Sequence, residues 1–180
     1  MRTCVLGAGS WGTTLAIVLA ENGHEVSLWD HDAERAAVVA RLRETPAFLP
    51  GVHISDGVAV TGQLGTAVRG AAIVTFVVPT HVMRATARAV RECGALADDA
   101  IIVSASKGLE EKTLARMSDV LRDELAVDAR RIVALAGPGH AEEVSRGIPT
   151  SVVAAARSET RAAAVSAPSA LSARVFERRR

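Results

Sequence analysis

Short, nearly continuous apolar stretches alternate along the chain with longer stretches in which apolar residues recur at helical spacing. The apolar stretches are rich in Val, Ile and Leu and mostly lack intervening polar residues, which is typical of strands buried on both faces of a parallel sheet. The pattern predicts strands at 3–7, 25–29, 72–78, 100–105, 131–136 and 150–155, with a weaker candidate at 57–61.

Amphipathic stretches between the predicted strands indicate helices over 11–23, 32–44, 80–93 and 112–125. In the last of these, one face would carry Leu114, Met117, Leu121 and Leu125. Alternating strands and helices predict βαβ units and a Rossmann-type, doubly wound α/β fold, with a mostly parallel sheet and helices on both faces. The Ala- and Ser-rich tail, interrupted by Pro168, suggests a short helix and then a strand at 173–176.

Composition narrows the class of protein. A hydrophobic fraction of 49% is enough for a sizeable core, and a formal net charge of +1 argues against nucleic acid or a membrane surface as a partner. No apolar stretch approaches the roughly 18 residues needed to cross a bilayer, and the first strand leaves no room for a signal peptide. Two cysteines, Cys4 and Cys93, are too few for a disulfide framework, and we expect Cys4 to be buried. These features favour a cytoplasmic location.

The hexapeptide GAGSWG directly follows the first predicted strand and opens the first predicted helix. Gly7, Gly9 and Gly12 have the G-x-G-x-x-G spacing inside a βαβ unit, which is the context that a dinucleotide-binding fingerprint requires. Gly7 permits a tight turn, Gly9 leaves space for a pyrophosphate, and Gly12 lets the helix approach the sheet. Amide groups at the helix start, near Ser10, would then face the phosphates. We therefore assign 1–177 to one dinucleotide-binding domain and 178–180 to an arginine-rich, solvated chain end.

Asp30 ends the second predicted strand, where a Rossmann fold meets the adenosine ribose. A carboxylate there accepts hydrogen bonds from the ribose diol and repels a 2′-phosphate, so Asp30 favours NAD. His31 and Arg35 are each able to meet a phosphate, which leaves NADP possible.

Other chemistries lack the residues they need. A short-chain dehydrogenase needs a tyrosine, and the chain has none. The P-loop motif GK[ST] and the metal motifs HExxH and CxxC are also absent. A helix start with solvated charges explains His140, Glu142 and Glu143 better than a metal site does. We therefore expect no metal.

Three further segments follow predicted strands, at the edge where a doubly wound sheet gathers its functional loops: VVPTHV, SASKGLE and LAGPGHAEEV. SASKGLE carries Lys107, which with Lys112 is one of only two lysines among 21 basic residues. Lys107 would supply a point charge to a phosphate and a proton to a carbonyl oxygen; a surface lysine in a turn is the alternative. In LAGPGHAEEV, the turn at Gly137 and Gly139 leads into a helix and would present amides to an anion.

The stretches GAGSWGTTLA, NGHEVSLW, VVPTHV, SKGLE and GPGHAEEV…GIPTSVV together resemble, in order and spacing, the bacterial NAD(P)-dependent sn-glycerol-3-phosphate dehydrogenases. The resemblance implies reversible reduction of dihydroxyacetone phosphate to sn-glycerol 3-phosphate. It implies cofactor contacts at Ser10, Trp11, His31, Lys107 and Ala141. It implies substrate contacts at Lys107, Gly137 and Gly139.

Two departures from the family bear on activity. Family members usually have Ser or Thr where this chain has Gly139, so a hydroxyl donor to the substrate is missing. They also carry the catalytic lysine in a following all-helical domain, in a GGAxKN-like context that does not occur in these 180 residues. We therefore expect cofactor binding without turnover by this chain alone, and a homodimer or a helical C-terminal partner as its associations.

Two alternatives stay open. A non-catalytic NAD(H)-binding module would share the glycine fingerprint and lack the activity. A ketopantoate reductase or a sugar-acid dehydrogenase would share the scaffold, although SKGLE and GPGHAEEV disfavour that interpretation.

Overall fold

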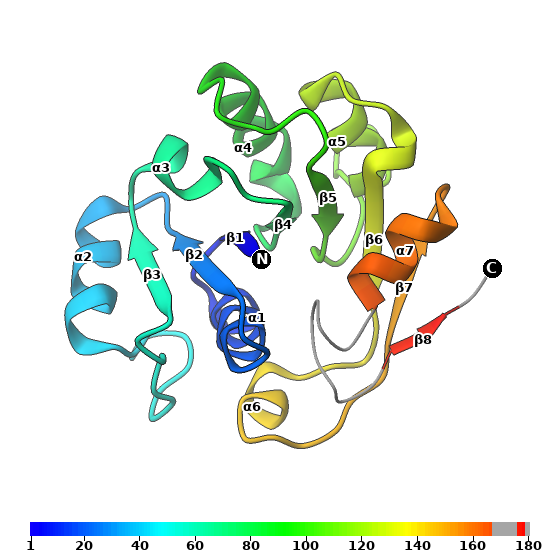
Figure 1. Ribbon diagram of the computed structural model, residues 1–180. Coiled ribbons are helices and arrows are strands. Elements are labelled where there is room, and N and C mark those ends of the chain that lie inside the picture. Colours follow the sequence, from blue (N-terminus) through cyan, green and yellow to red (C-terminus); the bar gives the residue numbers. More distant parts are fainter. Residues whose placement is uncertain (167–175, 179–180) are drawn as a thin grey trace.

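The structure is a computed structural model that describes residues 1–166 and 176–178. Within these residues, eight strands form one sheet in the order β3-β2-β1-β4-β5-β6-β7-β8 (Figure 1). Neighbouring strands are parallel except for β6 and β7, which are antiparallel. The strands are β1 Arg2–Leu6, β2 Glu25–Trp29, β3 Val58–Thr61, β4 Ile73–Phe76, β5 Ile101–Ser104, β6 Ile132–Ala136, β7 Val152–Ala156 and β8 Phe176–Arg178. This sheet confirms the predicted doubly wound, mostly parallel architecture.

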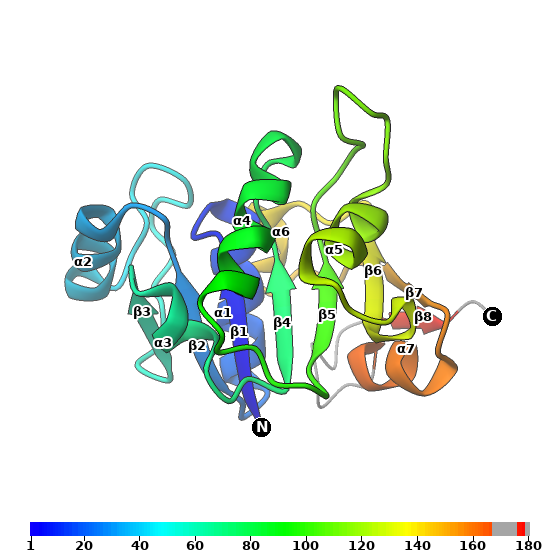
Figure 2. The same cartoon turned by 90° about the horizontal axis from the view of Figure 1, so that it is seen from above.

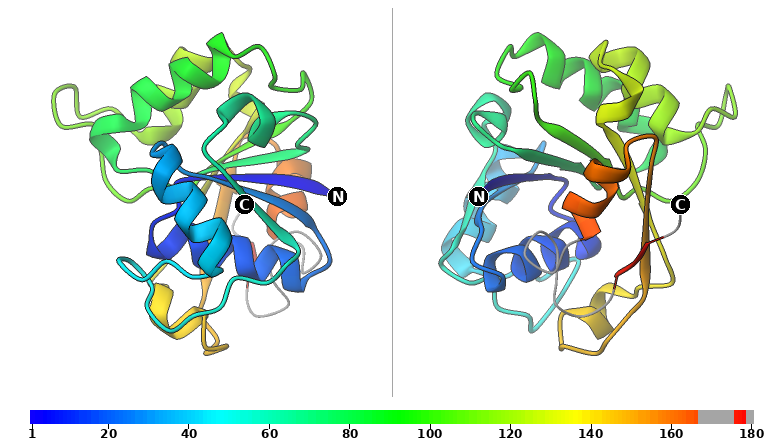
Figure 3. Two further views of the ribbon diagram at one scale, coloured as in Figure 1. Left: turned by 90° about the vertical axis from the view of Figure 1, so that its left-hand side faces the viewer. Right: turned by 45° about the vertical axis from the view of Figure 1, so that its right-hand side comes forward.

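Helices cover both faces of the sheet, so that it lies between two helical layers (Figure 3). The helices are α1 Ser10–Glu21, α2 Ala33–Leu42, α3 Leu64–Val68, α4 Thr80–Glu92, α5 Met117–Leu125, α6 Ala141–Val144 and α7 Glu159–Ser166, with a 3₁₀ turn at Ala129–Arg131. None of the described helices is both long and apolar enough to cross a membrane.

The core divides into two clusters, because successive residues of a strand point to opposite faces of the sheet. In β1, Val5 joins the cluster that includes Leu15 of α1, whereas Cys4 and Leu6 join the cluster that includes Met83 of α4. Cys4 is 0% exposed, as expected, and burial raises the pKa of its thiol far above the usual range.

The chain end fits the expectations in part. α7 provides the short helix of the tail, and β8 begins at Phe176, the last residue of the strand predicted at 173–176. Residues 173–175 lie outside the described residues. The backbone of Arg178 pairs with Ala154, and 179–180 are not described, so the boundary between 177 and 178 stays a prediction.

The prediction of one helix over 112–125 was wrong in its first part, because α5 begins only at Met117. Leu114 has a left-handed backbone (φ 57°) and is 70% exposed, so it does not share the buried face of Met117. Residues 109–116 instead form a closed loop, in which the Glu110 N–H donates to the Ala115 carbonyl at 2.9 Å. This loop projects beyond the edge of the sheet where β4 and β5 end (Figure 2).

Candidate functional site

A groove lies at the carboxyl edge of the sheet, where the strand order reverses between β1 and β4. Loops on either side of such a switch point diverge and leave a crevice, which here has a volume of ≈ 960 Å³. The groove gathers all the residues predicted to contact a cofactor: Gly7, Gly9, Ser10, Trp11, Gly12, Asp30, His31, Lys107 and Ala141. Their roles stay predictions, but the structure brings them to one place.

The three fingerprint glycines differ in their surroundings. Gly7 has φ +115°, which side chains rarely adopt, and a Cβ there would lie 2.7 Å from the Val77 carbonyl oxygen. A Cβ on Gly12 would lie 1.8 Å from the Gly7 carbonyl oxygen, so only glycine lets α1 approach the turn. A Cβ on Gly9 would meet no atom within 4 Å, because Gly9 faces open space. The turn is therefore closely packed at Gly7 and Gly12, on the side toward the sheet and α1, and open at Gly9.

The amino end of α1 suits an anion. No side chain caps the helix at Gly9, and its first turn holds no acidic residue. The Thr13 N–H donates to the Gly9 carbonyl at 2.9 Å, so the helical bonds begin there and the preceding amides are directed past the end of the helix. These amides and the partial positive charge of the helix end attract a phosphate, and the open side of Gly9 gives it room. The cradle thus fits a pyrophosphate.

Asp30 at the end of β2 is held by Arg35. The Arg35 Nε donates to one carboxylate oxygen of Asp30 at 2.8 Å, its Nη2 donates to the other, and Asp30 is only 2% exposed. The Arg35 guanidinium also lies 5.4 Å from the centre of the Phe48 ring, and both side chains line the groove. His31 Nδ1 lies 3.3 Å from Asp30 Oδ1. A ribose at this end would therefore meet an ion pair and not a free carboxylate.

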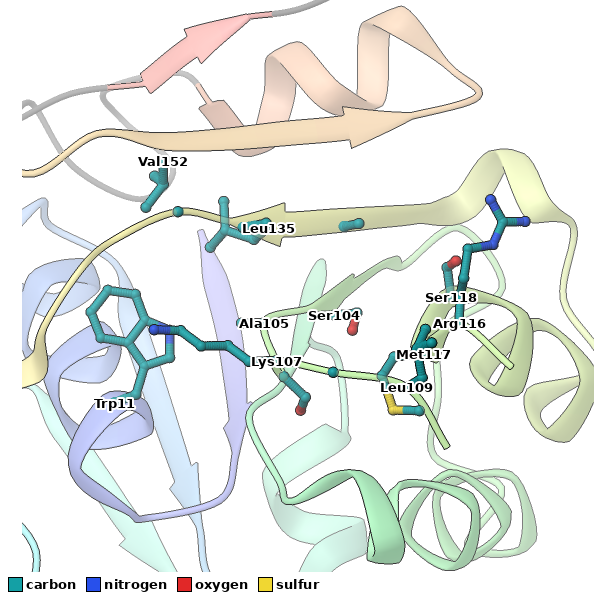
Figure 4. A pocket seen from close by; sticks show the side chains of 15 residues that line it. Trp11, Ser104, Ala105, Lys107, Leu109, Arg116, Met117, Ser118, Leu135 and Val152 are labelled. Atoms are coloured by element: carbon teal, nitrogen blue, oxygen red, sulfur yellow. The ribbon is translucent and has the colours of Figure 1, made fainter. Parts of the chain in front are cut away.

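Lys107 stands between two cavities. Its Nζ donates a long hydrogen bond of 3.5 Å to the Gly139 carbonyl, and both residues line the groove. The same side chain lines a second cavity of ≈ 440 Å³, which also touches Trp11 and Gly137 (Figure 4). Contact with both cofactor and substrate, as predicted for Lys107, is compatible with this junction.

Gly137 and Gly139 line different cavities and are glycines for different reasons. A Cβ on Gly137 would lie 2.5 Å from the Ser151 carbonyl oxygen, so close backbone packing alone requires glycine there. A Cβ on Gly139 would lie 3.0 Å from Cη2 of Trp11 and 3.4 Å from Cγ2 of Thr150, which are side-chain atoms able to give way. At Gly139, the Trp11 ring therefore packs close to the backbone, and a side chain there would need the ring to move by a few tenths of an ångström.

Ala141 begins α6 and is tied to α1. The single hydrogen of the Thr14 hydroxyl is shared between the Ser10 carbonyl oxygen, 2.9 Å away, and the Ala141 carbonyl oxygen, 3.2 Å away. The bond to Ala141 joins residues that are 127 positions apart in the sequence. The turn at Gly139 is thereby held against the amino end of the first helix.

Sequence reasoning missed several residues of the groove. Phe48 comes from the loop after α2, and Ala85 and Ala89 come from one face of α4. Nothing in the local pattern around Phe48 marks it as part of a site. The pairing of Asp30 with Arg35 was also missed, although Arg35 itself was noted as a group able to meet a phosphate.

A doubly wound sheet with a side-chain-free turn, an uncapped helix start and a groove at the switch point defines the class of Rossmann-type dinucleotide-binding domains. The family described as NAD-dependent glycerol-3-phosphate dehydrogenase N-terminus matches residues 2–162. The chain belongs to this family.

Individual relatives agree with the family. Glycerol-3-phosphate dehydrogenase [NAD(P)+] from Moorella thermoacetica is 45% identical over 152 residues, covering 84% of this chain and 44% of the relative. The enzyme of the same name from Geobacter sp. (strain M21) is 43% identical over 159 residues, covering 88% of this chain and 47% of the relative. The matched part of this chain therefore spans less than half the length of either relative.

A solved structure confirms the fold. Glycerol-3-phosphate dehydrogenase from Coxiella burnetii superposes with a TM-score of 0.89 at 23% identity. The match covers 99% of this chain and 53% of the other. At this identity the likeness concerns the fold alone.

Proposed function

We propose that this chain is the cofactor-binding part of an NAD(P)-dependent glycerol-3-phosphate dehydrogenase. The observation that carries the proposal is the cradle at Gly9, which is open above, tight beneath, and continuous with the groove that gathers the predicted cofactor residues. The reaction is the reversible reduction of dihydroxyacetone phosphate to sn-glycerol 3-phosphate, and the nicotinamide carrier supplies the hydride when bound.

Different residues would contact different parts of the cofactor. Amides at Gly9, Ser10 and Trp11 hold the pyrophosphate, with Gly7 and Gly12 shaping the turn. Asp30 and His31 contact the adenosine ribose, and Lys107 and Ala141 lie toward the nicotinamide. Lys107, Gly137 and Gly139 contact the substrate, where the Lys107 ammonium neutralises phosphate or donates a hydrogen bond to the ketone oxygen.

The charges near Asp30 favour NAD over NADP. Arg35 lies within ion-pair distance of two carboxylates, those of Asp30 and Asp32, so the three side chains together carry an excess of negative charge. That excess repels a 2′-phosphate. Binding of NADP remains within the proposal, because Arg35 also presents its guanidinium to the groove.

We propose small phosphorylated substrates, and neither nucleic acid nor a membrane, as partners, in line with the formal net charge of +1. The two cysteines are free, which suits the reducing cytoplasm that we propose as the location. A second copy of the chain or a helical C-terminal domain is the protein association that the family resemblance suggests.

Thermal unfolding with and without ligands tests the proposal. NADH at one hundred times its Kd should stabilise the fold by ~2.7 kcal/mol, whereas dihydroxyacetone phosphate alone should not shift Tm. Absence of a shift with both NADH and NADPH would overturn the proposal.

Absorbance at the NADH band tests turnover. We expect a background rate of NADH oxidation by these 180 residues with dihydroxyacetone phosphate, because neither Lys107 nor Lys112 stands in the GGAxKN-like context of the family. A normal rate would contradict the expectation that turnover needs the lysine that family members carry in their helical domain. Oxidation restored by adding the helical domain of a relative would separate a dehydrogenase from a non-catalytic module.

A further inference from the structure

Arg84 on α4 holds two carboxylates from two other segments. Its Nε and Nη2 donate to the two oxygens of Glu110 at 2.8 and 2.9 Å, and its Nη1 donates to Glu124 of α5 at 2.6 Å. Arg88 adds a bond of 3.2 Å to Glu124. The Glu110 and Glu124 side chains are only 14% and 11% exposed, so water and salt screen these ion pairs less than pairs at an open surface. We name these four residues the Arg84 cluster.

Glu110 and Lys107 both lie in the loop that connects β5 to α5, residues 105–116, of which the closed loop at 109–116 is the second part. Gly108 lies between them and has φ +109°. Because glycine adopts many backbone conformations, Gly108 alone does not fix the direction of the chain. On the side toward β5, the Ser106 hydroxyl donates to the Val78 carbonyl at 2.6 Å. On the far side, Glu110 meets Arg84. Lys107 is therefore held between one anchor on each side.

Apolar packing does little to hold this loop. Its two large apolar side chains, Leu109 and Leu114, are 48% and 70% exposed. A segment that buries little apolar surface opens at low free-energy cost unless polar contacts hold it. The bidentate bond from Arg84 is such a contact, and Thr113 of the same loop also donates to Glu110. The position of the loop thus depends strongly on Glu110.

We propose that Glu110, held by Arg84, is a positioning residue that fixes Lys107 at the junction of the two cavities. Glu110 itself lines neither cavity, and Lys107 is the residue nearest to it in the loop that lines the cofactor groove, so its effect on NADH would pass through Lys107. The role of Lys107 in binding rests on the proposed function, whereas the mechanical link between Glu110 and Lys107 does not.

A double-mutant cycle tests the link in binding. NADH titrations give Kd for the wild type, Glu110→Gln, Lys107→Met and the double variant. We expect Glu110→Gln alone to raise Kd roughly three- to tenfold, a coupling usual within one hydrogen-bond network. In the Lys107→Met background, the same change should leave Kd unaltered, which a general structural defect would not do.

Glu124→Gln is the matched control. It removes the other carboxylate from Arg84 but lies on α5 and outside the loop, so we expect Kd close to that of the wild type. Arg84→Lys keeps the charge and loses the bidentate bond, and it should fall between the wild type and Glu110→Gln. It also serves if Glu110→Gln does not fold.

A readout without ligand uses the scarcity of lysine. Reductive methylation with ¹³C labels only Lys107, Lys112 and the terminal amine, and Lys107→Met and Lys112→Arg variants assign the lysine signals. We expect the Lys107 signal to move toward its position in the unfolded chain in Glu110→Gln, and to stay in place in Glu124→Gln.

Three results would overturn the inference. One is an equal effect of Glu110→Gln with and without Lys107, and another is an effect of Glu124→Gln as large as that of Glu110→Gln. The third is a pair of results: Lys107→Met raises Kd for NADH, whereas Glu110→Gln changes neither Kd nor the Lys107 signal. If the wild type binds neither NADH nor NADPH, the proposed function fails, and the lysine signal still decides whether Glu110 positions Lys107.

Discussion

At the scale of single residues, Gly9 and Gly12 differ most in the space around them. An alanine at Gly12 would press its Cβ against the Gly7 carbonyl, 1.8 Å away, whereas an alanine at Gly9 would meet nothing within 4 Å. We expect Gly12→Ala to lower the free energy of unfolding by roughly 1–3 kcal/mol. Urea denaturation measures this change.

Gly9→Ala should separate binding from folding. We expect its stability within about 0.5 kcal/mol of the wild type, because the methyl group enters open space. The same methyl group would occupy the space of a phosphate, so Kd for NADH should rise tenfold or more, equivalent to ~1.4 kcal/mol. An unchanged Kd in a folded Gly9→Ala variant would contradict the placement of the pyrophosphate.

We predict that Asp30 governs the choice between NADH and NADPH. Replacing it with asparagine removes one negative charge and frees Arg35, whose Nε and Nη2 now bind the carboxylate. We expect the ratio of NADPH affinity to NADH affinity to rise about tenfold in Asp30→Asn, since ~1.4 kcal/mol corresponds to that factor. Parallel titrations with both carriers measure the ratio. A ratio that stays constant would remove Asp30 as the discriminating group.

At the scale of elements, the Arg84 cluster joins α4, α5 and the loop between β5 and α5. Hydrogen bonds from Arg84, and then from Thr113, lower the pKa of Glu110 from 4.5 to about 2. Because the folded-state pKa is the lower one, the contribution of Glu110 to stability is complete above about pH 4.5 and is lost as the pH falls through about 2.

The difference in Tm between the wild type and Glu110→Gln should follow this titration. We expect a constant difference from about pH 7 to pH 5, and a decline toward zero as the pH falls through about 2. Circular dichroism melts measure it, with Glu111→Gln as a control that removes a neighbouring, exposed carboxylate. A difference that grows toward low pH would show that Glu110 is not held as an ion.

The elements were predictable where burial sets the pattern. A strand covered on both faces is largely apolar, so β4 and β5 were recognisable as nearly continuous apolar runs. α3 is only Leu64–Val68, too short to display a helical period, and was not predicted. The false start of α5 has another cause. Leu114 has the right spacing for the helix face, but the hydrogen bonds of the loop hold it outside the helix.

At the scale of the whole molecule, the candidate site joins loops that follow β1, β2, β4, β5 and β6. The sequence predicted single positions of the candidate site, because the spacing of the glycines and a lysine among many arginines are visible in the local sequence. It did not predict which charged side chains meet. Arg84 and Glu124 are 40 positions apart, and the fold alone brings them together.

The central claim is that the amino end of α1, reached through a turn without side chains, holds the phosphates of a nicotinamide carrier. Titration of NADH into the ¹⁵N-labelled chain, followed by amide NMR, tests it most directly. The claim predicts that the amides of Gly9, Ser10 and Trp11 shift most, saturate together and give one Kd. If these amides stay in place while NADH is in large excess over the folded chain, the claim is wrong.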